Sequence, residues 1–112
     1  MPFNATLETI NHTAKITLSG ELDASTAPSF KEEVEKAASQ NVKKLVLLVK
    51  DLDYMSSAGL RVFIFAKQKM GAAVDIYIVG ANEMVMDTIE KTGFHHSVFV
   101  LNEYDTAQFE TV

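Results

Sequence analysis

A run of β-prone apolar residues, LVLLV at Leu45–Val49, constrains the fold more than any other segment of the chain. A strand with one solvated face alternates apolar and polar residues, whereas this run contains no polar residue, so both of its faces should be covered. Strands of this kind lie in the centre of parallel sheets. We therefore expect an α/β fold in which Leu45–Val49 is a central strand, with helices on both sides of the sheet.

The segment ahead of this run predicts an antiparallel hairpin at the N-terminus. Phe3–Ile10 alternates apolar and polar residues, and the alternation resumes between Ala14 and Leu18. Asn11 and His12, which lie between the two stretches, are typical of a turn. This pattern indicates a hairpin with one solvated face.

Helices and strands alternate after the hairpin. Polar residues ahead of Pro28, followed by apolar residues at helical spacing, predict a first helix that begins near Ala24–Thr26 and ends around Ser39–Asn41. The later elements are expected as a helix at Ser56–Met70, a strand at Ala73–Val79, a short helix at Asn82–Lys91, a strand at Val98–Leu101 and a final helix at Glu103–Glu110. The order is then ββαβαβαβα. Because helical crossovers separate the later strands, we expect a mainly parallel sheet beyond the N-terminal antiparallel hairpin.

The size and charge of the chain exclude several classes of protein. Its 112 residues suffice for one core, so residues 1–112 are expected to form one domain. The net charge is -5 and the ten lysines and arginines are scattered, which argues against nucleic acid as a partner. No basic leader precedes an apolar core, and no apolar run approaches the roughly 20 residues that cross a bilayer. We therefore expect no membrane insertion.

The absence of cysteine removes disulfides and thiolate chemistry, which fits a reducing, cytoplasmic setting. A zinc ion would have to depend on histidine and carboxylate ligands alone. His95 and His96 are adjacent and would point to opposite faces if extended, so they cannot readily share an ion. We expect neither a metal nor a cofactor.

The segment YMSSAGLRV, Tyr54–Val62, lies where the central strand ends and a helix begins, and we call Tyr54–Gly59 within it the serine turn. The first N–H groups of that helix lack backbone partners, and in open α/β sheets function often gathers at this edge. In one interpretation, Ser56 or Ser57 caps the helix by accepting a hydrogen bond from those N–H groups. In the other, one hydroxyl is phosphorylated, and the helix N-terminus stabilises the dianion.

Three segments together resemble the STAS domains of bacterial anti-sigma factor antagonists. They are YMSSAGLRV, GELDASTAPSF at Gly20–Phe30, and the strand LVLLVKDLD ahead of the turn. The resemblance covers nearly the whole chain and agrees with the order of elements given above. It implies that the unphosphorylated protein binds an anti-sigma factor kinase and frees a sigma factor. It also implies that the kinase inactivates the protein by phosphorylating one serine, and that a protein phosphatase resets the switch.

The resemblance aligns the family's phosphorylated serine with Ser57, and Ser56 is the second candidate. Ser56 stands where the family often has aspartate. Leu48 and Lys50 stand where many members have an aspartate and a serine. These differences remove negative charge near the turn.

Two further residues have both a structural and a functional interpretation. Asp23, in the GELD segment, matches a family position close to the serine turn, and it either caps the first helix or belongs to the partner surface. Phe65 falls on the polar arc of its helix, and it either anchors a partner or packs against a neighbouring helix such as the one that carries Met84 and Met86. The residues expected to bind the partner are Asp23, Ser25, Thr26, Met55, Ser56, Ser57, Ala58, Gly59, Arg61 and Phe65.

The function expected from these observations is that of a phosphorylation-gated interaction module rather than an enzyme. A hydrolase elbow would need a glycine two residues before the serine, and neither Ser56 nor Ser57 has one. One alternative is a constitutive STAS scaffold in which Ser57 only caps its helix. Another is a sensor of a small molecule or nucleotide that uses the helix N-terminus after Tyr54.

Overall fold

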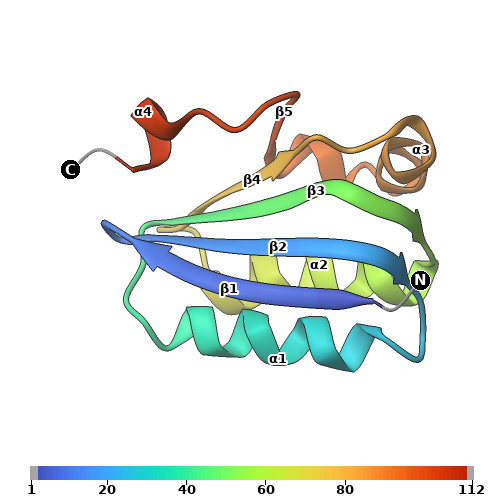
Figure 1. Cartoon of the computed structure of the whole chain (residues 1–112), viewed down its shortest axis with the longest axis horizontal. Coiled ribbons are helices and arrows are strands. Elements are labelled where there is room, and N and C mark those ends of the chain that lie inside the picture. The colour runs from blue at the N-terminus through green and yellow to red at the C-terminus, as the bar shows by residue number, and fades with distance from the viewer. Residues whose placement is uncertain (1–2, 111–112) are drawn as a thin grey trace.

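The computed structural model describes residues 3–110, whose strands form one sheet in the order β1-β2-β3-β4-β5 (Figure 1). The strands are β1 (Asn4–Ile10), β2 (Thr13–Leu22), β3 (Lys44–Met55), β4 (Asp75–Val79) and β5 (Phe99–Leu101). β1 and β2 are antiparallel, and each later strand is parallel to the one before it. The predicted α/β fold, with an N-terminal hairpin and an otherwise parallel sheet, is confirmed.

The hairpin closes at Asn11 and His12, as the sequence predicts. Both residues have positive φ, 49° and 66°, and a two-residue turn of this hand matches the twist of the flanking strands. From the turn the register runs without interruption to Asn4 opposite Ser19.

β3 continues to Met55, well beyond the apolar run that predicted it. Its register against β2 shifts twice, each time by one extra residue in β3, so the strand contains two bulges. The bulges keep Val49, Leu52 and Met55 buried although they are three residues apart, a spacing that strict alternation does not allow. The bulges therefore allow β3 to continue as a strand up to the serine turn.

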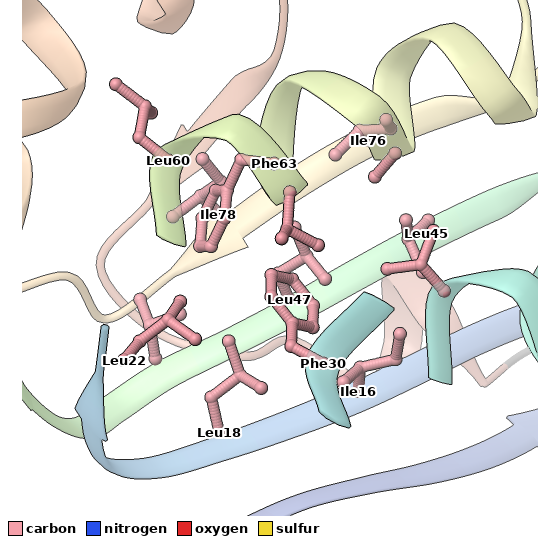
Figure 2. Packing of buried hydrophobic residues seen from close by; sticks show 14 of the residues in the cluster. Ile16, Leu18, Leu22, Phe30, Leu45, Leu47, Leu60, Phe63, Ile76 and Ile78 are labelled. Carbon is pink, nitrogen blue, oxygen red and sulfur yellow. The ribbon is translucent and has the colours of Figure 1, made fainter. Parts of the chain in front are cut away.

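Three helices contribute to the main core: α1 (Ala27–Ala38), α2 (Ser57–Met70) and α3 (Glu83–Lys91). α1 and α2 lie side by side on one face of the sheet (Figure 1). Figure 2 shows Phe30 of α1 and Phe63 of α2 among the inward side chains of the strands, and their rings meet edge to face with centroids 5.3 Å apart. Within residues 3–110, no helix is long and apolar enough to cross a membrane.

The C-terminal segment, residues 102–110, covers part of the opposite face of the sheet. Its helix, α4, spans only Thr106–Phe109, because Asp105 caps it by accepting a hydrogen bond from the Ala107 N–H at 3.0 Å. The predicted helix at Glu103–Glu110 was therefore too long. Phe109 packs against outward side chains of β3 and β4. Of the helices described, α4 alone packs on this face, so the expected helical cover on both sides is only partly present.

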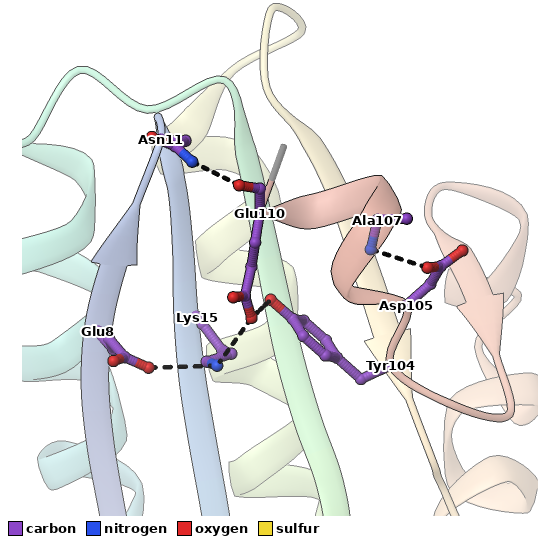
Figure 3. Close-up of polar contacts among 7 residues, drawn as sticks. All are labelled: Glu8, Asn11, Lys15, Tyr104, Asp105, Ala107 and Glu110. Carbon is purple, nitrogen blue, oxygen red and sulfur yellow. Dashed lines mark hydrogen bonds and ion pairs between the residues drawn. The ribbon is translucent and has the colours of Figure 1, made fainter. Parts of the chain in front are cut away.

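Polar contacts hold the C-terminal segment against the hairpin (Figure 3). Glu110 Oε2 accepts a hydrogen bond from Tyr104 Oη at 2.8 Å and lies 3.7 Å from Lys15 Nζ. Lys15 also pairs with Glu8 of β1 at 3.2 Å, and Asn11 Nδ2 donates to the backbone carbonyl of Glu110. Burial, followed by the bond to Glu110, raises the pKa of Tyr104. These contacts connect the segment to β1 and β2.

A 3-10 helix, η1 (Phe94–His96), precedes β5 and was not predicted from the sequence. Gly93 starts it with a φ of 76°, in the left-handed region that favours glycine. Because the segment is helical, the His95 and His96 rings lie 3.9 Å apart instead of pointing to opposite faces.

Candidate functional site

The serine turn begins at the end of β3 and lies beside the end of β2. Leu22 pairs with Met55 at the last position of the register, and the Ser56 N–H donates to the Leu22 carbonyl at 2.8 Å. The residues after Leu22 and those after Met55 therefore start side by side. The fold thus brings GELDASTAPSF and YMSSAGLRV together at the carboxyl edge of the sheet, where α/β proteins commonly place functional sites.

Ser56 is the residue that caps α2. Its backbone is extended, with φ -86° and ψ 174°, and its hydroxyl accepts a hydrogen bond from the Gly59 N–H at 3.4 Å. Ser57 is the first helical residue, and it is exposed. The interpretation in which Ser57 caps the helix is therefore wrong, and the helix does not need the Ser57 hydroxyl as its cap.

The two serines should differ in their effect on stability. Ser56→Ala is expected to lower the free energy of unfolding by about 0.5 to 1 kcal/mol, near the lower end for a cap because the hydrogen bond is long. Ser57→Ala is the matched control, and its free energy of unfolding is expected within about 0.5 kcal/mol of wild type because the side chain is exposed. Urea denaturation measures both. A larger loss of unfolding free energy for Ser57→Ala than for Ser56→Ala would contradict the assignment of Ser56 as the cap of α2.

Gly59 allows the first turn of α2 to lie directly on β2. A Cβ at this position would be 2.6 Å from Leu22 Cγ and 3.1 Å from Met55 Cγ. Gly59 is buried, and Met55 is only 2% exposed. Both residues were predicted to contact the partner. That prediction is wrong, because they are buried and lie beneath the exposed residues of the serine turn.

Asp23 organises the turn that precedes α1. Its Oδ1 accepts hydrogen bonds from Ser25 Oγ at 2.7 Å and from the N–H groups of Ser25 and Thr26 at 2.9 and 3.2 Å. Donation by the Ser25 hydroxyl is the main reason that the pKa of Asp23 lies below its usual value. Thr26 occupies the N-cap position of α1, so the interpretation of Asp23 as that cap is wrong. Asp23 instead closes the turn beside Ser56.

Asn82 fixes α3 to the strand that carries the serine turn. Its Oδ1 caps α3 by accepting a hydrogen bond from the Val85 N–H at 2.8 Å, and its Nδ2 donates to the Leu52 carbonyl at 3.1 Å. β4 pairs with β3 only as far as Val79 opposite Leu48, so Leu52 lies beyond that ladder. Asparagine ahead of a helix predicts a cap. The hydrogen bond to the Leu52 carbonyl could not be predicted, because no sequence pattern indicates it.

Exposed side chains of several kinds surround the turn. Ser25 and Arg61 are exposed, and Ser56, Ala58 and Thr26 are half-buried. Apolar side chains add to them: Tyr54 is 41% exposed and Met84, in the first turn of α3, is 52% exposed.

Phe65 is half-buried and packs toward α1. Lys31 Nζ lies 4.8 Å from the centroid of the Phe65 ring, a distance typical of a cation–π contact. The structural interpretation, that Phe65 packs against a neighbouring helix, therefore agrees with the structure, although the contact shown is with α1 and not with α3, which was given as the example. The role of Phe65 as a partner anchor stays a prediction.

Comparison with known proteins was made by family, by sequence and by structure. The STAS domain family matches residues 4–108. A sequence comparison with curated proteins gave no match. Among solved structures, an anti-sigma factor antagonist from Mycobacterium paratuberculosis has a TM-score of 0.87 and 20% identity, over 96% of this chain and 92% of that chain.

SpoIIAA, an anti-sigma factor antagonist, is similar in both of its forms. The unphosphorylated form has a TM-score of 0.71 and 18% identity, over 94% of this chain and 93% of its own length. The phosphorylated form, from Bacillus, has a TM-score of 0.72 and 18% identity, over 94% of this chain and 95% of its own. At such low identity the likeness shows the fold, which is shared over almost the full length of both chains.

Proposed function

The chain belongs to the STAS domain family, and from this membership we propose that it is an anti-sigma factor antagonist. In the proposed cycle the unphosphorylated protein binds an anti-sigma factor serine kinase, which releases a sigma factor. Phosphorylation of Ser57 by that kinase ends the interaction, and a cognate protein phosphatase restores it. One observation carries the proposal: Ser56 caps α2, and Ser57 is exposed at the first helical position.

A phosphate on Ser57 is compatible with the fold as it stands. The unpaired N–H groups at the start of α2 and the positive end of the helix dipole favour an anion at this position. Arg61 is exposed four residues later, at a spacing that places two side chains on the same face of a helix. A phosphate could therefore make charge-assisted hydrogen bonds without displacing a buried group.

The same phosphate would change the surface that the partner contacts. It adds about -1.5 to -2 units of charge and three acceptor oxygens. Asp53 and Glu21 near the turn are exposed, so the added charge falls in a region that already carries carboxylates. Like-charge contact at an interface costs several kcal/mol. Since about 1.4 kcal/mol is a factor of ten, affinity should fall by well over tenfold without refolding.

The test is phosphate transfer from an anti-sigma factor kinase of the same organism, with ATP, followed by intact mass. Wild type and Ser56→Ala should each gain one phosphate, and Ser57→Ala should gain none. The phosphorylated protein should then bind the kinase more than tenfold more weakly than the unmodified protein in a calorimetric titration.

Two outcomes would contradict the switch in different ways. Binding to the kinase without phosphate transfer would favour the constitutive STAS scaffold. That alternative is considered because Leu48, Lys50 and Ser56 differ from the residues that are common in the family. Transfer to Ser56 in preference to Ser57 would overturn the assignment of the residue but keep the mechanism. Ser29→Ala is the matched control for an exposed serine in α1 outside the predicted partner surface, and it should still gain the phosphate.

A further inference from the structure

A cavity of about 410 Å³ lies on the sheet face opposite α1 and α2. None of the residues that line it belongs to the serine turn. They come from β3, from the end of β4 and from the C-terminal segment: Leu48, Lys50, Val79, Gly80, Asn102, Glu103 and Tyr104. The sensor considered as an alternative from the sequence used the N-terminus of α2, so this cavity is a different site. Its volume falls within the range of small-ligand sites, roughly 300 to 1,000 Å³.

The walls of the cavity are held in position from outside. The Tyr104 ring stacks on Phe109 with centroids 5.2 Å apart, and its hydroxyl donates to Glu110 at 2.8 Å. On the other side, the Gly80 N–H donates to the Leu101 carbonyl at 2.9 Å. Gly80 has a φ of 81°, and a Cβ there would lie 3.3 Å from the Cα of Lys50, so glycine permits β3 and the end of β4 to approach closely. A ligand would therefore meet a preformed site.

The cavity combines an apolar floor with opposite charges at its rim. Leu48, Val79 and Tyr104 line the cavity, and all three belong to or pack against the apolar cluster on this face of the sheet. Lys50 and Glu103 line the same cavity, and both are exposed. Within residues 3–110, the ion pairs of this structure include neither of them. The two charged residues thus line the same cavity, and no ion pair of the described residues joins them.

We propose that this cavity binds a free α-amino acid with an apolar side chain. The Lys50 ammonium would bind the ligand's carboxylate, the Glu103 carboxylate would bind its ammonium group, and the apolar side chain would lie on Leu48 and Val79. Each ligand group then has a partner of matching chemistry. The proposal also gives a role to Leu48 and Lys50, two departures from the family pattern that the phosphorylation switch does not use.

Other ligand classes fit the lining less well. A nucleotide would bring several phosphate charges to a cavity with one lysine and a carboxylate beside it, so repulsion by Glu103 would oppose binding. A purely apolar ligand would leave both charges without a partner. The zwitterion offers a partner to each of the two charged residues, and this makes the proposal specific enough to test with small analogues.

The experiment follows backbone amide shifts of the ¹⁵N-labelled protein during titration with L-leucine and L-phenylalanine. At least one of them should cause saturable shifts at Lys50, Gly80 and Asn102, while Ser56 and Ser57 move little. Three analogues of leucine each remove one recognised group: 4-methylpentanoate lacks the ammonium, 3-methylbutylamine lacks the carboxylate, and glycine lacks the apolar side chain. Each should bind at least about tenfold more weakly than L-leucine, which is about 1.4 kcal/mol per lost contact.

Matched variants separate the two charges of the rim. Lys50→Gln and Glu103→Gln should each weaken amino-acid binding about tenfold, whereas Lys43→Gln and Asp51→Asn, which remove the same charges outside the cavity, should not. No saturable shift at the cavity residues with either amino acid, up to tens of millimolar, would overturn the proposal. Equal binding of 4-methylpentanoate and L-leucine would overturn it as well. Phosphate transfer to Ser57 is measured separately, so failure here leaves the proposed switch unaffected.

Discussion

Replacing Gly59 with valine is expected to lower the free energy of unfolding by about 3 kcal/mol, at the upper end for overpacking a core. The Cβ alone would lie 2.6 and 2.8 Å from Leu22 Cγ and Cδ2, and valine adds two methyl groups to it. Leu22 is fully buried, so it has no solvent-filled space to move into. Urea denaturation of the variant against wild type measures the loss.

A second substitution shows whether that contact is the cause. In a Leu22→Ala background the clash is removed, so Gly59→Val should cost about 1.5 kcal/mol less than it does in wild type, a coupling energy within the range for residues in contact. If the two losses are simply additive, the close packing between Gly59 and Leu22 is not what limits this position. The same variants would also show whether partner binding depends on the packing of Gly59 against Leu22 beneath the serine turn.

Phe109→Ala is expected to cost about 3 to 4 kcal/mol, as for other large buried aromatic residues. Phe109 is 1% exposed and meets the Tyr77 ring edge to face, with centroids 4.7 Å apart. It is the one fully buried side chain of α4, so its loss should also release the C-terminal segment from the sheet. Thermal or urea unfolding gives the free energy, and faster amide exchange at Val46 would report the exposed face.

Phe99→Ala provides the matched control on the same tyrosine. Phe99 stacks on Tyr77 with centroids 4.9 Å apart, but it is 51% exposed, so its removal should cost about 1 kcal/mol or less. Similar losses for the two variants would mean that the C-terminal segment contributes little to the fold. That result would also argue against a preformed cavity, since Phe109 supports the ring of Tyr104, which lines the cavity.

The parts of the fold that could be predicted are those specified by local pattern. LVLLV identified a central strand, and Pro28 together with apolar residues at helical spacing located α1. Asn11 and His12 marked a turn that the structure contains. In each case the element is specified by residues that are close together in the sequence, so the local pattern is enough to predict it.

The parts that were missed depend on contacts between distant residues. The second half of β3 was not predicted, because its bulges are defined against β2 and its apolar spacing resembles neither a strand nor a helix. Asp23 and Ser56 were both reasonable caps, and only the positions of the groups that donate to them show that Asp23 closes a turn while Ser56 caps α2. Met55 looked accessible because it lies beside two serines, yet Gly59 covers it.

The two bulges of β3 also limit how the length of this strand can change during evolution. Each bulge offsets the alternation by one residue, so deletion of a single residue between Lys50 and Tyr54 would invert every side chain beyond it. Such a deletion would turn Met55 toward solvent and aim the serine turn away from the end of β2. Relatives that keep a working turn should therefore conserve the number of residues here even where the residues themselves differ, and should accept insertions in the loops instead.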